Sequence, residues 1–222
     1  MADFLVRETV SPDLLEVAGK LCKISGLKDF NIVGGTALAL QIGHRKSLDI
    51  YLFQNSPDGI ADFTSILDDC KEIFKNVNVV SIYENRALIT QIEGIKVDFV
   101  VQRNSGMLDK PLIINDLRLA SIRDIAAMKI MAVATTSNRI KDYVDIYYLL
   151  KQFSLETMFD LYQKKYNTGG VQTALDNLPY FYDVSRDEFE ALDFLDTAPS
   201  LKDVCGTLAR EVMRYSKKIM GL

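Results

Sequence analysis

The stretch that decides the fold runs Val33-Gly34-Gly35-Thr36-Ala37-Leu38-Ala39-Leu40 and continues as His44-Arg45-Lys46-Ser47-Leu48-Asp49-Ile50-Tyr51-Leu52-Phe53. Its first segment predicts a short strand that ends in two glycines and enters an apolar helix, and its second predicts a basic turn followed by a strand. Glycine lets a backbone approach a phosphate closely, and a helix N-terminus offers free N–H groups. Such turns are also common as purely structural elements, so this pattern alone assigns no function.

Two acidic residues lie alone in apolar strands. Asp49 precedes Ile50, and Asp98 is central in Ile95–Val101. A carboxylate in a buried strand is destabilising unless it is paired or bound to a metal. We therefore expect Asp49 and Asp98 to face one cation from adjacent strands, in preference to the alternative that Asp98 lies at a solvent-exposed edge. Position 51 shares a strand face with Asp49 and is a tyrosine.

A charged cluster is expected in the second half of the chain. The segment 125–134 is apolar except for Lys129, which predicts a buried helix whose one charge needs a partner or a cleft. Arg139, Lys141, Asp142 and Asp145 follow, and the two aspartates share one helical face. These residues either line a binding site or form a solvated face with Lys129 extended toward the surface.

The order of the predicted elements separates strands from helices. Helices are expected at 11–25, 36–42 and 60–75, and strands at 30–33, 47–53, 77–83, 87–92 and 95–101. After Pro111 only helices are expected, at 121–135, 140–153, 154–166, 185–195 and 200–219, with capping boxes at Ser185/Glu188 and Ser200/Asp203. This order predicts an α+β fold, with an α/β domain over residues 1–115 and a helical domain over residues 116–222.

Taken in order, these motifs over residues 28–152 resemble the signature of the AbiEii/AbiGii nucleotidyltransferases of the DNA polymerase β-like superfamily. The resemblance implies a polymerase β-like α/β domain, with Asp49 and Asp98 holding Mg²⁺ or Mn²⁺. Together with Lys129 these two residues would be catalytic. The implied nucleotide-binding residues are Gly34, Gly35, Thr36, Arg45, Ser47, Lys129, Arg139 and Asp142. The family pattern has a second aspartate where this chain has Tyr51, and tyrosine is a poor Mg²⁺ ligand.

The resemblance also implies an activity. It is the transfer of a nucleoside monophosphate from an NTP to a hydroxyl group of tRNA or protein, by the toxin of a toxin–antitoxin or phage-defence system with a cognate antitoxin as partner. Tyr51 leaves open a second interpretation, in which the protein is catalytically degenerate and binds a nucleotide or a partner. Residues 153–222 carry no motif that points to either function.

Composition excludes several classes of protein and of site. The 222 residues include 26 basic and 30 acidic side chains, so a broad basic nucleic-acid surface is excluded. The three cysteines are far apart and predict buried hydrophobic positions in a reducing cytosol. No apolar run approaches the ~18 residues of a membrane span, so a cytoplasmic protein is expected. His44, the only histidine, argues against a zinc site, and the turn 44–46 either contacts triphosphate or is a plain basic turn.

Overall fold

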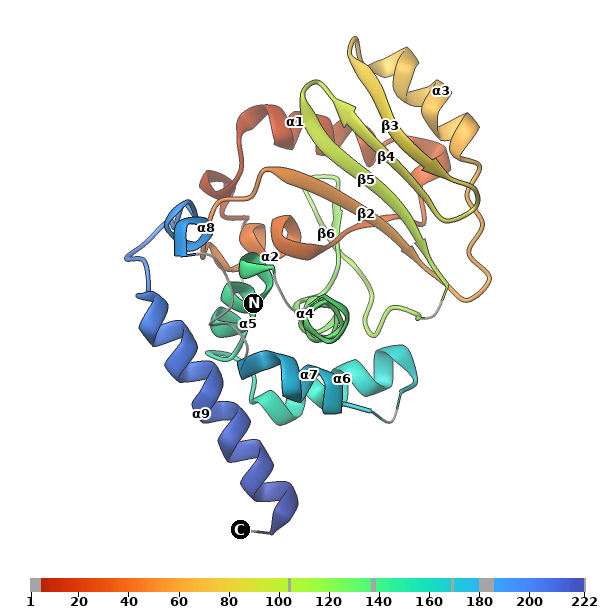
Figure 1. The fold of residues 1–222 in the computed structure, drawn as a ribbon. Helices are drawn as coiled ribbons and strands as arrows, with labels where there is room; N and C mark the ends of the chain where they lie inside the picture. The colour runs from red at the N-terminus through yellow and green to blue at the C-terminus, as the bar shows by residue number, and fades with distance from the viewer. Residues whose placement is uncertain (1–4, 104, 137–138, 169, 180–185, 222) are drawn as a thin grey trace. The chain divides into compact units, whose positions relative to one another are not determined.

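The computed structural model describes residues 5–103, 105–136, 139–168, 170–179 and 186–221. Its contacts divide the chain into two units, Met1–Ser121 and Ile122–Leu222. The first unit carries a seven-stranded mixed sheet with helices, and the described part of the second is mainly helical, which confirms the predicted α+β class (Figure 1). The sequence placed the domain boundary at residue 115. The first unit extends further because the side chain of Arg118 donates hydrogen bonds to the backbone oxygens of Cys22, Leu27 and Phe30.

The sheet has the strand order β3-β4-β5-β2-β1-β7-β6. Its strands are β1 (Asn31–Ile32), β2 (Asp49–Asn55), β3 (Val77–Tyr83), β4 (Ala87–Ile92), β5 (Ile95–Gln102), β6 (Leu112–Ile114) and β7 (Leu117–Leu119). β2 is parallel to β5 and antiparallel to β1, and β1 is parallel to β7. The hairpin β6–β7 was not predicted, because three residues are too few to show a strand period. Asn115 and Asp116 form its turn with positive φ, a conformation that these residue types tolerate.

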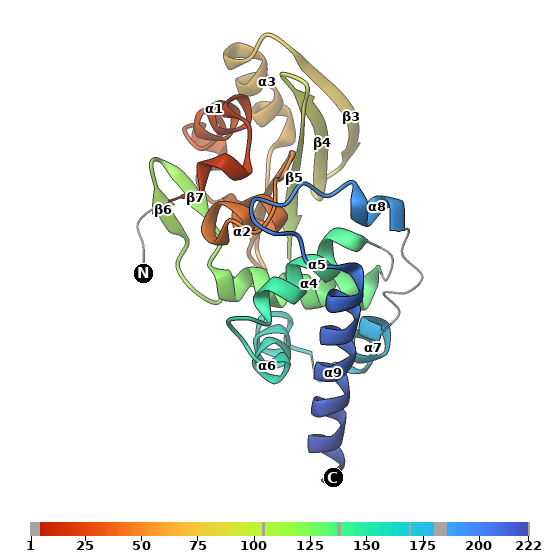
Figure 2. The ribbon, with the colours of Figure 1, turned by 90° about the vertical axis from the view of Figure 1, so that its left-hand side faces the viewer.

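Three helices accompany the sheet, namely α1 (Pro12–Leu21), α2 (Gly34–Ile42) and α3 (Phe63–Ile73). Ser11 caps α1 as predicted, by accepting the backbone N–H of Leu14. This helix ends at Leu21, four residues earlier than expected, and a 3-10 turn, Ser25–Leu27, follows it. α1 and α3 lie on one side of the strands (Figure 2). Ile50 and Leu52 are fully buried, whereas Asp49 and Tyr51 are only partly buried, so the site residues lie on the other sheet face.

The second unit contains α4 (Ile122–Thr135), α5 (Ile140–Leu149), α6 (Leu155–Tyr166), α7 (Gln172–Asn177), α8 (Arg186–Glu190) and α9 (Leu201–Met220). The central helix α4 contacts α5, α6 and α7 and is apolar on most of its surface, as expected for a buried helix. The capping box of Ser200 and Asp203 is confirmed. α7 was not predicted, and α8 is shorter than the predicted helix 185–195. Ser185 lies outside the described residues, so its predicted capping box does too.

The cysteines occupy the predicted environment, since Cys22, Cys70 and Cys205 are all buried. Within the described residues, no helix combines the length and the apolar character that crossing a membrane requires.

Candidate functional site

The glycine turn is built against strand β2. Gly34 has a φ of 68°, in the left-handed region that glycine adopts without strain, and the backbone N–H of Val33 donates to the backbone oxygen of Tyr51 at 2.9 Å. A Cβ placed on Gly34 would lie 3.7 Å from Cδ2 of Tyr51. The tyrosine ring therefore lies directly beside the turn for which the sequence predicts phosphate contact.

Two buried hydroxyls fix the turn to the start of the acidic strand. Thr36 is 1% exposed, and its Oγ1 lies 2.7 Å from Oγ of Ser47 and donates to the backbone oxygen of Asp49. These contacts hold the first turn of α2 against the residue that leads β2. Nucleotide contact by Thr36 and Ser47 stays a prediction, and what the structure shows for both is a role in positioning Asp49.

The basic turn before β2 has two buried residues, His44 and Arg45, and one exposed residue, Lys46. His44 and Arg45 are 3% and 2% exposed, and the Arg45 guanidinium donates to the backbone oxygen of Lys46 at 2.9 Å. Arg45 therefore helps to shape the entry to β2. Its predicted contact with triphosphate stays a prediction.

The two acidic strands lie side by side with one face in common. β2 and β5 are parallel neighbours, and their register pairs Asp49 with Lys96 and Tyr51 with Asp98. Cross-strand partners point to the same side, as do residues two apart on one strand, so all four side chains share a face. The expectation that Asp49 and Asp98 lie on adjacent strands and not on opposite faces is confirmed.

A lysine that the sequence reasoning did not single out completes this face. Nζ of Lys96 lies 3.1 Å from Oδ2 of Asp98 and 5.4 Å from the centre of the Tyr51 ring. Burial lowers the pKa of Lys96, but its hydrogen bond to Asp98 and the charges of Tyr51 and Asp98 outweigh this effect and raise the pKa above its ordinary value. The spacing Lys96-Val97-Asp98 was the available signal, because residues two apart on a strand share a face.

The four side chains on this face differ in their ability to bind a divalent cation. Asp49 and Asp98 offer oxygen ligands of the kind that Mg²⁺ prefers. Tyr51 stands where the family pattern has a second aspartate, and the ammonium of Lys96 pairs with Asp98. No group of three or more His, Cys, Asp or Glu residues suited to a metal ion occurs among the residues that the structure describes. Binding of one cation by Asp49 and Asp98 therefore stays a prediction, for which these two carboxylates are the available oxygen ligands.

The second unit has its own charged cluster. Nζ of Lys129 lies 2.6 Å from Oδ1 of Asp142 and 2.6 Å from Oδ2 of Asp145, and all three side chains are at most 8% exposed. The ammonium thus joins α4 to α5 through two carboxylates. Of the two alternatives for Lys129, extension toward the surface is wrong. The prediction that this cluster meets the Gly34-Gly35 turn stays a prediction.

Arg139 lies at the edge of this cluster. Its Nε is 3.7 Å from Oδ2 of Asp142, and its side chain is 52% exposed. With Lys141 it lines a cavity of about 570 Å³ whose other lining residues include Glu188. Arg139 is therefore accessible to an anionic ligand, whereas Lys129 and Asp142 are held in the buried cluster.

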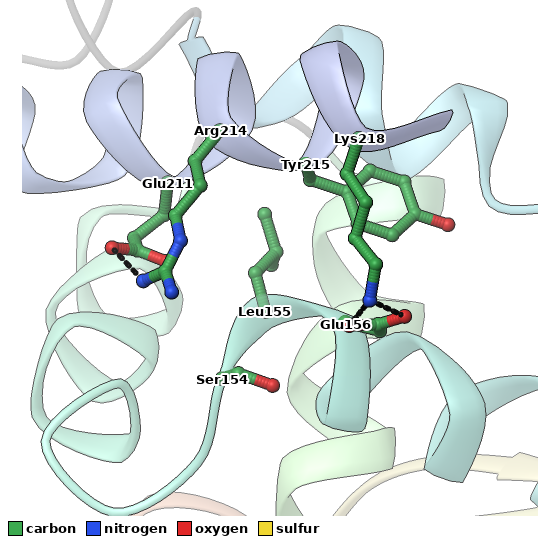
Figure 3. Close-up of a pocket in the computed structure, with 7 residues that line it drawn as sticks. All are labelled: Ser154, Leu155, Glu156, Glu211, Arg214, Tyr215 and Lys218. Atoms are coloured by element: carbon green, nitrogen blue, oxygen red, sulfur yellow. Dashed lines mark hydrogen bonds and ion pairs between the residues drawn. The ribbon is translucent and has the colours of Figure 1, made fainter. Parts of the chain in front are cut away.

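Two further features of the second unit involve none of the predicted site residues. A second buried ion pair joins Nζ of Lys165 to Oδ1 of Asp124 at 2.7 Å, with both side chains 0% exposed. A small pocket lies beside α9, where Lys218 pairs with Glu156 at 2.6 Å and Arg214 with Glu211 at 3.9 Å (Figure 3). The pocket contains no residue of the predicted site.

The class of protein follows from the first unit. A mixed sheet whose glycine turn enters a helix beside two acidic parallel strands is the arrangement of the nucleotidyltransferase fold. The model of the family described as nucleotidyl transferase AbiEii toxin, type IV toxin–antitoxin system, matches residues 25–204, and the chain belongs to that family.

Two known proteins match nearly the whole chain, one in sequence and one in fold. The uncharacterized protein aq_aa25 of Aquifex aeolicus strain VF5 is 31% identical over 205 residues, which are 90% of this chain and 94% of the relative. The crystal structure of JHP933 from Helicobacter pylori has a TM-score of 0.57 at 15% identity and covers 96% of this chain and 95% of its own. At that identity the second likeness shows the fold alone.

Proposed function

We propose that this toxin-family protein transfers a nucleoside monophosphate from an NTP to a hydroxyl group of tRNA or protein. The observation that carries the proposal is the placement of Asp49 and Asp98 on one face of two adjacent parallel strands, beside the Gly34 turn. In this reaction the acceptor hydroxyl releases its proton to solvent, and its oxygen forms a bond to the α-phosphorus. The bond from that phosphorus to the β-phosphate oxygen breaks, and pyrophosphate leaves.

Mg²⁺ or Mn²⁺ would be held by Asp49 and Asp98. When bound, it would supply positive charge that stabilises the phosphate oxygens during transfer. The chain's own groups orient the nucleotide. The N–H groups at the start of α2 would orient the phosphates. In the second unit, the exposed guanidinium of Arg139 is a proposed contact for phosphate oxygens. Lys129, held between Asp142 and Asp145, joins α4 to α5. A cognate antitoxin is the proposed protein partner.

A second function is favoured by two residues on the acidic face. Tyr51 replaces the second carboxylate of the family pattern, and Lys96 forms an ion pair with Asp98. Tyr51 is neutral and Lys96 is positively charged, so the affinity of this face for a cation should be low. In this alternative the protein is catalytically degenerate and binds a nucleotide or a partner without transfer.

The test is incubation of the protein with each α-³²P-labelled NTP, with Mg²⁺ or Mn²⁺, and with either total RNA or RNase-treated cell extract. The RNA arm and the protein arm separate the two acceptors. Label transferred by the wild type and lost in Asp49→Asn supports the proposed transfer. Label absent from the wild type but present with Tyr51→Asp supports the degenerate alternative. If neither protein labels anything, the transferase proposal is overturned.

Titration calorimetry with an α,β-methylene NTP measures the binding step by itself. We expect weak Mg²⁺-dependent binding by the wild type and tighter binding by Tyr51→Asp, because the substitution restores paired carboxylates on one strand face. Strong Mg²⁺-dependent binding by the wild type, with no gain in the variant, would mean that Tyr51 does not weaken the site.

A further inference from the structure

Lys96 stands in the middle of the acidic face. It is the cross-strand partner of Asp49, and it lies two residues before Asp98 on the same strand. Its side chain is 45% exposed, while that of Asp98 is 9% exposed. The ammonium therefore pairs with a largely buried carboxylate and remains accessible from solvent.

The contacts of Lys96 resemble those of a bound cation. It lies 3.1 Å from Oδ2 of Asp98 and 5.4 Å from the Tyr51 ring centre, so a carboxylate and a π face both stabilise its charge. An aspartate at position 51 would offer the ammonium a second carboxylate in place of this ring. In this chain, Asp98 is therefore the carboxylate with which Lys96 pairs on this face.

A second lysine makes the same two kinds of contact, an ion pair and a contact with an aromatic ring, and serves for comparison. Lys20 is also 45% exposed, pairs with Glu16 at 2.7 Å, and lies 5.7 Å from the ring centre of Phe74. Its carboxylate partner is 66% exposed and one helical turn away, so this pair is a surface contact. Lys96 differs because its carboxylate partner is largely buried and is a predicted metal ligand.

We propose that Lys96 is a built-in counter-cation of the site, which occupies Asp98 until a triphosphate draws it away and thereby releases Asp98 for a divalent cation. The inference rests on the proposed function, since it requires a triphosphate at this face. A flexible, half-exposed lysine exchanges readily between carboxylate and phosphate oxygens. Since the ammonium and the metal compete for one carboxylate, nucleotide binding and metal binding strengthen each other by the same factor.

The experiment is titration of the full chain with Mn²⁺ alone, and then with Mn²⁺ in the presence of an α,β-methylene NTP. Without nucleotide, we expect Lys96→Met to bind Mn²⁺ at least about five-fold more tightly than the wild type, because about 1 kcal/mol of competing ion pair is removed. With nucleotide, the wild type should gain Mn²⁺ affinity and Lys96→Met should gain much less. Lys96→Arg should retain the wild-type coupling.

Lys20→Met is the matched control, and it should leave both Mn²⁺ affinities unchanged. The inference is overturned if Lys96→Met matches Lys20→Met in the nucleotide-free titration, or if neither protein binds Mn²⁺. Circular dichroism of each variant shows whether it is folded, and Lys96→Gln provides a second neutral variant. Failure of the proposed function is distinguishable, because it is measured as the absence of transferred label and not as a change in nucleotide-free Mn²⁺ affinity.

Discussion

Replacement of Lys129 by methionine tests the buried cluster of the second unit. The ammonium contacts two carboxylates at 2.6 Å each, and Asp145 is 0% exposed. Removal of one partner from a buried ion pair typically lowers the free energy of unfolding by about 3–5 kcal/mol, since the remaining charge lacks its compensation. Two carboxylates depend on this lysine, so we expect a loss toward the upper end of that range. Whole-domain stabilities are about 5–15 kcal/mol, which makes this a large fraction.

Urea denaturation followed by far-ultraviolet circular dichroism measures the loss, with Lys217→Met on the exposed side of α9 as control. Lys129→Met/Asp142→Asn/Asp145→Asn should recover part of the stability, because neutral amides are less destabilising than buried carboxylates without their cation. A loss below about 1 kcal/mol, equal to that of Lys217→Met, would refute the reasoning, because such values are typical of exposed pairs. If Lys129→Met loses this much stability, a fall in its nucleotide affinity cannot be assigned to a lost nucleotide contact. Lys129→Arg keeps the positive charge.

Three further predictions concern other parts of the chain. Gly34→Ala should lower the free energy of unfolding by about 1–2 kcal/mol in urea titrations, because the φ of Gly34 is 68°. The added Cβ itself would meet only an ordinary contact at 3.7 Å. The control Gly19→Ala, inside α1, should be neutral or stabilising. Asp124→Leu and Lys165→Met should each lower the free energy of unfolding by about 3–5 kcal/mol, because each leaves one buried charge without its partner. The double variant should lose much less, since it removes both charges. Equal losses in the single and double variants would contradict this prediction. Burial raises the pKa of Cys70 to about 12, so at pH 8 its thiol should react with a disulfide reagent only after unfolding, and rapid reaction of the native chain would show that Cys70 is accessible.

Most of the elements and their order could be predicted from local sequence patterns. Helix and strand periods, the serine caps and the glycine turn are local patterns, and each depends on neighbours a few residues away. The same kind of pattern indicated Asp49, Asp98 and Lys129 as charges in apolar surroundings. A lone charge in an apolar segment shows that a partner is needed, but the local pattern does not contain the identity of that partner.

The partners of these charged residues follow from contacts between elements that are distant in sequence. The register of β2 against β5 joins segments that are far apart in the chain, and a shift by one residue would have placed Asp98 on the opposite face from Asp49. That register brings Lys96 and Tyr51 to the carboxylates, and the packing of α4 against α5 gives Lys129 two aspartates instead of one. Periodicity encodes which side of an element is buried, whereas the choice of contacts across elements depends on geometry that forms when the whole unit packs.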